Sequence, residues 1–181
     1  DATISFFKTT HSVPESLGIV VGTDEGNIVY TGDFKFDQAA RKYYRTDLGR
    51  LTEIGREGVL ALLSDSANAT SHVMTASEAE VAAEMDSAIA DAEGRVIIAA
   101  VASNLVRIQQ VFDSAAEYGR RVVLTGFDAE NIVRTAIHMK RLRLVDEKLI
   151  IKPKDMHKYE DHELIILEAG RMGEPINGLH K

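Results

Sequence analysis

Helix-like and strand-like segments alternate from residue 77 to residue 167, and this alternation is the feature that most restricts the fold. The apolar spacing predicts a helix at 77–92, a strand at 95–101, a helix at 104–118, a strand at 121–125, a helix at 128–142, and strands at 149–151 and 163–167. Such alternation favours right-handed β-α-β units and a mostly parallel, doubly wound sheet. Ligands of such sheets bind at the carboxyl ends of the strands.

The residues up to about Ser66 have a different character, because strands dominate there. Apolar, partly alternating segments predict strands at 3–7, 16–21, 27–31 and 59–63. Residues 22–27 predict a hairpin loop whose glycines supply positive φ. The chain therefore divides into a strand-rich first part and an α/β second part.

Two helix starts are marked by capping residues. Thr46 is the predicted N-cap of a helix that runs to residue 56, with Leu48, Leu51 and Ile54 on one face. Thr75 and Glu78 have the spacing of a capping box, which predicts that the next helix opens there.

Composition excludes several classes of protein. The 181 residues are 45% hydrophobic, enough for one or two small domains, and the net charge of −7 does not suit indiscriminate phosphate binding. The most basic stretch, residues 152–158, is predicted to be a solvated loop.

The absence of cysteine excludes disulfides and thiolate metal sites and fits a cytoplasmic protein. No apolar run approaches the ~20 residues that span a bilayer, so no membrane is expected as a partner. We expect the chain to be a piece of a longer polypeptide.

Polar residues that could carry chemistry follow the predicted strands. His11 and Asp33 each lie just beyond a strand end, where imidazole nitrogen and carboxylate oxygen can bind a divalent metal such as zinc. The alternative is structural, with His11 capping a loop and Asp33 forming an Asx-turn before Phe34. Asp65 also follows an apolar strand, and it either orients a metal-binding histidine or caps a turn.

Two further strand ends suggest phosphate contacts. Ser103 and Asn104 open a helix whose backbone N–H groups can accept a phosphate, and Arg107 can add charge. The alternative is an ordinary N-cap with a surface arginine. Residues 170–175, which include Arg171 and Glu174, form a strand-end turn that either contacts a ligand or is structural. No nucleophile elbow, Walker loop or dinucleotide-binding fingerprint is present.

Taken together, four strings resemble the ribonuclease J family, a bacterial branch of the metallo-β-lactamase superfamily with a β-CASP domain. The strings are THSVPES at 10–16, TGDFKFD at 31–37, LSDSANA at 63–69, and ASN at 102–104 with RIQQ at 107–110. The resemblance implies the C-terminal strands of a metallo-β-lactamase αββα sandwich in residues 1–66. It also implies a β-CASP domain, incomplete at its C-terminal end, in residues 67–181.

The resemblance also implies roles for residues. His11 would be a metal ligand, Asp33 would bridge two zinc ions, and Asp65 would be an acidic catalytic residue near the metals. Ser103, Asn104, Arg107, Arg171 and Glu174 would contact RNA or its phosphates. Family members cleave RNA as 5′-3′ exonucleases and as endonucleases in RNA processing and decay. Two zinc ions would be the cofactors of the full-length site.

The chain also departs from the family pattern. The histidine-rich motif that supplies most metal ligands would lie upstream of Asp1, so this chain alone is expected to be inactive and to hold zinc weakly. Val106 stands where the family usually has histidine, and Arg171-Met172 stands where many active members have Ser-Gln. Both departures resemble the second, weakly active paralogue, which implies a paralogous subunit in a homo- or hetero-oligomer. The alternative function is therefore a non-catalytic partner of an active ribonuclease J. A small-ester hydrolase is a third hypothesis, and the α/β second part argues against it.

Overall fold

The computed structural model describes residues 1–37, 39–40, 44–126 and 128–170, and these residues divide into two compact units between Glu80 and Val81. The sequence predicts a boundary between two domains at residues 66 and 67. That domain boundary stays a prediction.

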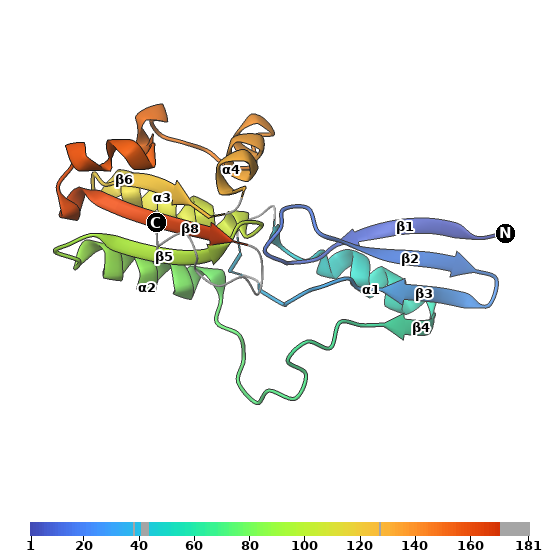
Figure 1. The fold of residues 1–181 in the computed structure, drawn as a ribbon. Coiled ribbons are helices and arrows are strands. Elements are labelled where there is room, and N and C mark those ends of the chain that lie inside the picture. The colour runs from blue at the N-terminus through green and yellow to red at the C-terminus, as the bar shows by residue number, and fades with distance from the viewer. Residues whose placement is uncertain (38, 41–43, 127, 171–181) are drawn as a thin grey trace. The chain divides into compact units, whose positions relative to one another are not determined.

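Among the residues that the structure describes, the first unit contains a four-stranded sheet and the α-helix α1 (Figure 1). The elements in chain order are β1 Thr3–Lys8, β2 Leu17–Thr23, β3 Gly26–Tyr30, α1 Leu48–Glu57 and β4 Val59–Leu63. The sheet order is β1-β2-β3-β4, in which the first three strands are antiparallel and β4 is parallel to β3. Because a parallel neighbour needs a crossover, α1 connects β3 to β4.

Helix α1 buries one face of this sheet. Ile54 of the helix packs with Phe7, Val20 and Val29, one from each of the three antiparallel strands. The opposite face is apolar as well, and Ile4 on that face is 66% exposed. Both faces of the sheet therefore carry apolar side chains, and α1 covers one of them.

The second unit is an α/β layer structure. Its elements in chain order are α2 Glu78–Ala90, which begins within the first unit, β5 Val96–Val101, α3 Leu105–Glu117, β6 Arg121–Thr125, α4 Ala129–His138, β7 Ile150–Ile151 and β8 Leu164–Gly170. Short 3-10 helices, η2 Glu147–Leu149, η3 Pro153–Lys158 and η4 Asp161–Glu163, flank the last two strands. The sheet order is β5-β8-β6-β7, and every pairing is parallel. The predicted α/β class with a parallel sheet is confirmed.

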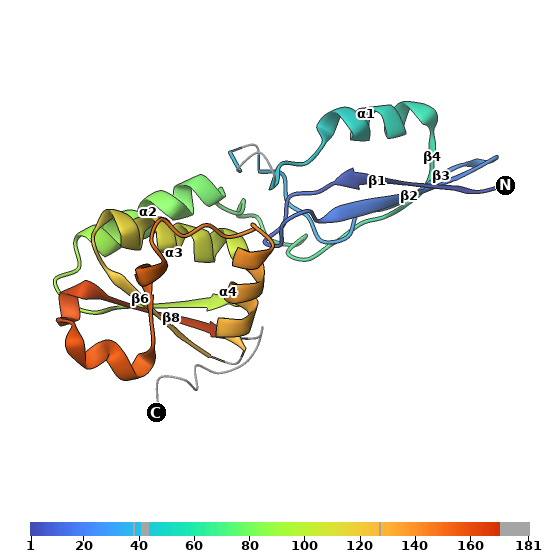
Figure 2. The same ribbon diagram turned by 90° about the horizontal axis from the view of Figure 1, so that it is seen from above.

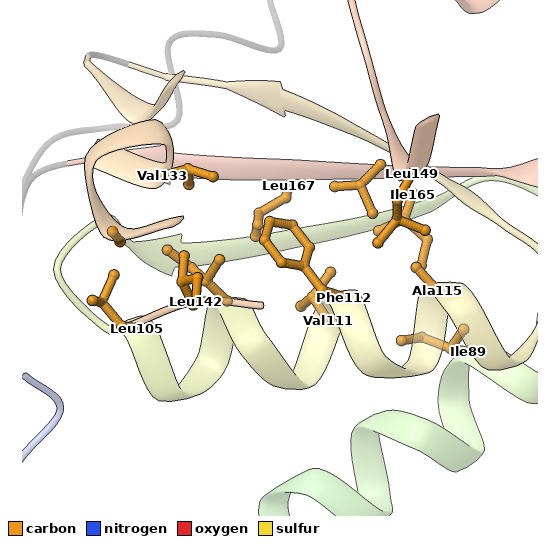
Figure 3. Close-up of a cluster of buried hydrophobic side chains, with 13 residues drawn as sticks. Ile89, Leu105, Val111, Phe112, Ala115, Val133, Leu142, Leu149, Ile165 and Leu167 are labelled. Atoms are coloured by element: carbon orange, nitrogen blue, oxygen red, sulfur yellow. The ribbon is translucent and has the colours of Figure 1, made fainter. Parts of the chain in front are cut away.

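The main core lies between this sheet and its helices. Figure 2 shows α2 and α3 on the same side of the sheet. Phe112 and Val111 of α3 pack against Ile165 and Leu167 of the central strand β8, and Ile89 of α2 joins them (Figure 3). The other face of β8 packs instead against residues of η3 such as Met156. Strand β8 is thus covered on both faces, as parallel strands require.

The helix caps differ from the sequence prediction. The N-cap of α1 is Asp47, whose side chain accepts a hydrogen bond from the backbone N–H of Arg50, because Thr46 is engaged with Thr10 instead. The capping box of α2 pairs Ser77 with Glu80, two residues after the predicted pair. The prediction found both helices and misplaced their first turns.

Three other predictions are corrected. Helix α4 ends at His138, not at residue 142, because the chain turns there through a positive φ at Lys140. Residues 153–158 form the 3-10 helix η3 instead of a loop. Strand β5, predicted to be buried, lies at the sheet edge with Ile97 53% exposed. No helix in the described residues is long and apolar enough to span a bilayer.

Candidate functional site

The structure brings His11 and Asp33 together. Nε2 of His11 lies 3.6 Å from Oδ2 of Asp33, and the Asp33 side chain is 74% exposed. On its other side, Nδ1 of His11 lies 3.4 Å from Oγ of Ser12. The two predicted residues are therefore neighbours, with the carboxylate exposed and the imidazole partly exposed.

Backbone hydrogen bonds hold the two loops beside each other. The backbone N–H of Lys35 donates to the carbonyl oxygen of Thr10 at 2.9 Å, next to both members of the pair. Thr10 is 1% exposed, and its backbone N–H donates to Oγ1 of Thr46 at 3.1 Å. These contacts fix the backbone on which His11 and Asp33 stand.

A buried carboxylate anchors the far end of the Asp33 loop. Asp37 is 4% exposed and accepts hydrogen bonds from the backbone N–H groups of Ala39 and Glu78, at 3.0 and 2.8 Å. Its Oδ2 lies 3.5 Å from Nζ of Lys35, which also lies 3.1 Å from Glu78. Burial acts to raise the pKa of Asp37, but the N–H of Glu78 and the charge of Lys35 hold this pKa below its usual value. Sequence reasoning missed this network, because Glu78 lies 41 residues after Asp37 and no local pattern connects the two.

Asp65 is placed near the pair through the backbone of Phe34. Its Oδ2 accepts a 3.5 Å contact from the N–H of Phe34, and its Oδ1 accepts a 2.8 Å hydrogen bond from the N–H of Ala67. The second bond is an Asx-turn, so the predicted turn-capping role is present. The first bond connects Asp65 with the residue that follows Asp33.

The donor set fits part of a zinc site. Two ligands of a tetrahedral zinc with bonds of about 2.0–2.1 Å are separated by about 3.3 Å, close to the distance between His11 and Asp33. Imidazole and carboxylate are both ordinary zinc ligands. Within the described ranges no group of three or more His, Cys, Asp or Glu could hold a metal. The two residues would therefore supply only part of the ligand set of such a site.

The predicted phosphate contacts divide into two groups. Asn104 caps α3, and its Oδ1 accepts a 3.1 Å hydrogen bond from the backbone N–H of Arg107. Ser103 is exposed beside it, at the carboxyl end of β5. Arg171 and Glu174 lie outside the described residues. The structure thus brings Ser103, Asn104 and Arg107 to one helix start, and binding of phosphate there stays a prediction.

The same sheet edge holds a buried carboxylate that sequence reasoning did not find. Glu168, at the end of β8, is 6% exposed and accepts a hydrogen bond from the Thr125 hydroxyl on neighbouring β6. The residue after Thr125 is Gly126, with φ of +104°, and a Cβ there would lie 2.4 Å from the carbonyl oxygen of Ala169. The strand-end pattern gave the location, but no local signal marked Glu168 as buried.

Comparison with known proteins agrees with the sequence motifs. Residues 93–181 match the family model described as "Ribonuclease J, beta-CASP domain". The chain is 76% identical over 181 residues to "Ribonuclease J 2" of Streptococcus pyogenes serotype M3, covering 100% of this chain and 33% of that protein. It is 44% identical over 176 residues to "Ribonuclease J2" of Bacillus subtilis, covering 97% of this chain and 32% of that protein. The chain therefore spans about a third of the length of these relatives.

A solved structure shares the fold. A crystal structure of a protein of unknown function from Enterococcus faecalis V583 aligns with a TM-score of 0.65 at 11% identity, covering 95% of this chain and 42% of that chain. At this identity the likeness concerns the fold alone. The family model and the sequence relatives carry the assignment: the chain belongs to the ribonuclease J family, and its residues 93–181 correspond to that family's β-CASP domain.

Proposed function

We propose that this chain is part of a metal-dependent ribonuclease and that His11 and Asp33 contribute ligands to its metal site. The observation that carries the proposal is the 3.6 Å approach of the imidazole nitrogen to the carboxylate oxygen at two strand ends. Zinc is the proposed metal, because imidazole nitrogen and carboxylate oxygen both suit it. The remaining ligands would come from outside this chain.

The proposed reaction is hydrolysis of RNA phosphodiester bonds, as a 5′-3′ exonuclease and an endonuclease in cytoplasmic RNA processing and decay. When bound, zinc supplies positive charge that stabilises the charge developing on the phosphate oxygens. Asp33 holds its carboxylate toward the ring nitrogen of His11, and Asp65 fixes the backbone of the Asp33 loop. Ser103, Asn104 and Arg107, together with Arg171 and Glu174, are the proposed RNA contacts of the β-CASP part.

The test uses the longer protein that carries this chain. Asp33→Asn removes the charged ligand while keeping the size of the side chain, so RNA cleavage should fall at least 100-fold, about the loss expected for removal of a charge-stabilising group. Asp24→Asn is the matched control, because Asp24 is exposed in the β2–β3 turn and should leave cleavage unchanged. Undiminished cleavage by Asp33→Asn would remove the basis of the proposal.

A second candidate is a partner subunit with little activity of its own. Val106 favours it, because an apolar side chain that is 7% exposed stands in α3 at a position where the family usually carries histidine. The chain would then support an active paralogue. Combining that paralogue with Asp33→Asn protein separates the candidates: full activity of the mixed complex favours the partner role, and reduced activity favours a catalytic one.

A further inference from the structure

The turn that follows α4 has a defined conformation. The backbone N–H of Arg141 donates to the carbonyl oxygen of Ala136 at 2.8 Å, and the N–H of Lys140 donates to that of Ile137 at 2.9 Å. These two bonds form a Schellman motif, in which the left-handed residue is Lys140 with φ of +58°. Glycine is the usual residue at this position, because a side chain there is strained.

The turn is fixed by the side chain of Leu142 and by the backbone of Arg143. Leu142 is 2% exposed and packs in the main core. Gln109 of α3 then binds the backbone of Arg143 twice, accepting from its N–H at 2.7 Å and donating to its carbonyl oxygen at 3.0 Å. These contacts use only the backbone of Arg143, so its exposed side chain is presented from a fixed point.

The sequence of this turn is locally basic. Residues 138–145 contain three basic residues and no acidic residue, in a chain with net charge −7. Among the described residues, neither Lys140 nor Arg143 forms an ion pair, whereas Arg121, Arg134 and Lys158 each do. Lys140 and Arg143 are exposed and have no carboxylate partner among the described residues, so their charges are available to an anionic ligand.

Another lysine-containing segment of this unit is different. Residues 152–163 contain three basic and four acidic residues, and Lys158 is paired with Asp155 at 2.6 Å. The positive and negative charges of that segment nearly cancel, so it attracts an anion only weakly. It therefore serves as an internal comparison for the turn after α4.

We propose that the turn at residues 139–143 binds the phosphate backbone of single-stranded RNA, with Lys140 and Arg143 as the contacting residues. The choice of RNA rests on the proposed function. The site differs from the predicted contacts at the start of α3, because it lies beyond the end of α4 and uses side-chain charge instead of a helix N-terminus. Its contacts read no base, so binding is independent of RNA sequence.

The test measures binding of the 181-residue chain to a fluorescent 20-nucleotide RNA with a 5′-hydroxyl, at several salt concentrations and with a metal chelator present. Each phosphate contact to a single strand releases about 0.7 counterion, which corresponds to about fivefold in affinity at 0.1 M salt. Lys140→Gly with Arg143→Gln should therefore weaken binding about 25-fold and reduce the slope of log affinity against log salt by about 1.4. Lys152→Gln with Lys154→Gln removes the same charge and should change both quantities much less.

The choice of variants distinguishes an effect on protein stability from an effect on RNA binding. Lys140→Gly should raise the unfolding temperature, because glycine relieves the strained φ, while it weakens RNA binding. Should that variant be less stable, Arg143→Gln, which leaves the Gln109 contacts intact, carries the test alone with an expected fivefold loss at 0.1 M salt.

Three results would overturn the proposal: no RNA binding by the parent chain at 50 mM salt, equal losses in the turn and control double variants, or unchanged binding in the turn variants. None of these results depends on cleavage, since the chelator removes metal. Undiminished RNA cleavage by Asp33→Asn would instead overturn the proposed function, and the RNA-binding result would remain valid.

Discussion

The carboxylate of Asp37 accepts a 2.8 Å hydrogen bond from the backbone N–H of Glu78, a residue 41 positions later in the chain. This bond joins the end of the Asp33 loop to the first residue of α2. With Lys35 bridging both side chains, it makes the loop part of a fixed network. The position of Asp33 thus depends on a contact that is distant in sequence.

Asp37→Asn should lower the free energy of unfolding by about 2 kcal/mol at pH 7, since the amide keeps one acceptor oxygen and turns an N–H donor toward the other backbone N–H. The effect should depend on pH, because the pKa of Asp37 in the folded chain lies below its usual value of 3.8. A lowered pKa contributes stability that is present above about pH 4 and is lost as the pH falls through the folded value.

Urea unfolding of the parent chain and of Asp37→Asn between pH 7 and pH 3 measures this. The difference between the two should be constant from pH 7 to 5 and should shrink below pH 4. A difference that grows as the pH falls would contradict the assigned network. Asp24→Asn, in an exposed turn, should show no such dependence.

Arg120→Lys should destabilise the α/β unit by about 2–3 kcal/mol. Arg120 is 5% exposed, and its guanidinium donates to the carbonyl oxygens of Ile89, Ala92 and Gly94 at the end of α2. Lysine cannot reach three acceptors with the same fork, and carbonyls left without partners are costly when buried. Chemical denaturation measures the loss.

Arg134→Lys is the matched comparison for Arg120. Arg134 pairs with Glu130 on the exposed surface of α4, where such pairs contribute about 0.5 kcal/mol or less. An equal effect at the two positions would show that Arg120 has no special role at the end of α2.

Gly126→Ala should cost about 2–4 kcal/mol, because it combines a left-handed φ with a Cβ placed against the backbone of Ala169. Gly94→Ala is the control, since an added Cβ there meets nothing within 4 Å. Thermal unfolding of both variants checks the prediction. Comparable melting temperatures for the two would mean that β6 and β8 do not approach each other as described.

The isolated chain should retain less than one zinc ion per molecule after dialysis against a mild chelator. His11 and Asp33 would provide two ligands, and a structural or catalytic zinc needs at least three from protein. Elemental analysis of the dialysed chain measures the content. Two tightly held ions per chain would show that further residues of the chain bind zinc.

The sequence predicted most of the secondary structure and the class of the second unit. Strands 59–63 and 121–125 match the structure residue for residue, because apolar runs flanked by polar turns leave few alternatives. Helix starts were harder to predict, since Thr46 and Asp47 can both cap and only the contact with Thr10 decides between them. The exposure of β5 was missed because an apolar run does not reveal where a strand lies in its sheet.

The candidate site was predicted in part. His11 and Asp33 were identified by their position after strands, and the structure places them side by side. Asp37 and Glu168 were not identified, because burial of a carboxylate is decided by residues far away in the chain. Lys140 was also missed, since the αL conformation of a non-glycine residue leaves no mark in the sequence.

Strand β4 has a practical consequence for work on this chain. All five of its residues, Val-Leu-Ala-Leu-Leu, are exposed, and within the described ranges its outer edge pairs with no strand. An open, apolar edge is a template for intermolecular β-pairing. Purified chain should therefore self-associate as its concentration rises, and binding or unfolding measurements will be cleanest in dilute solution.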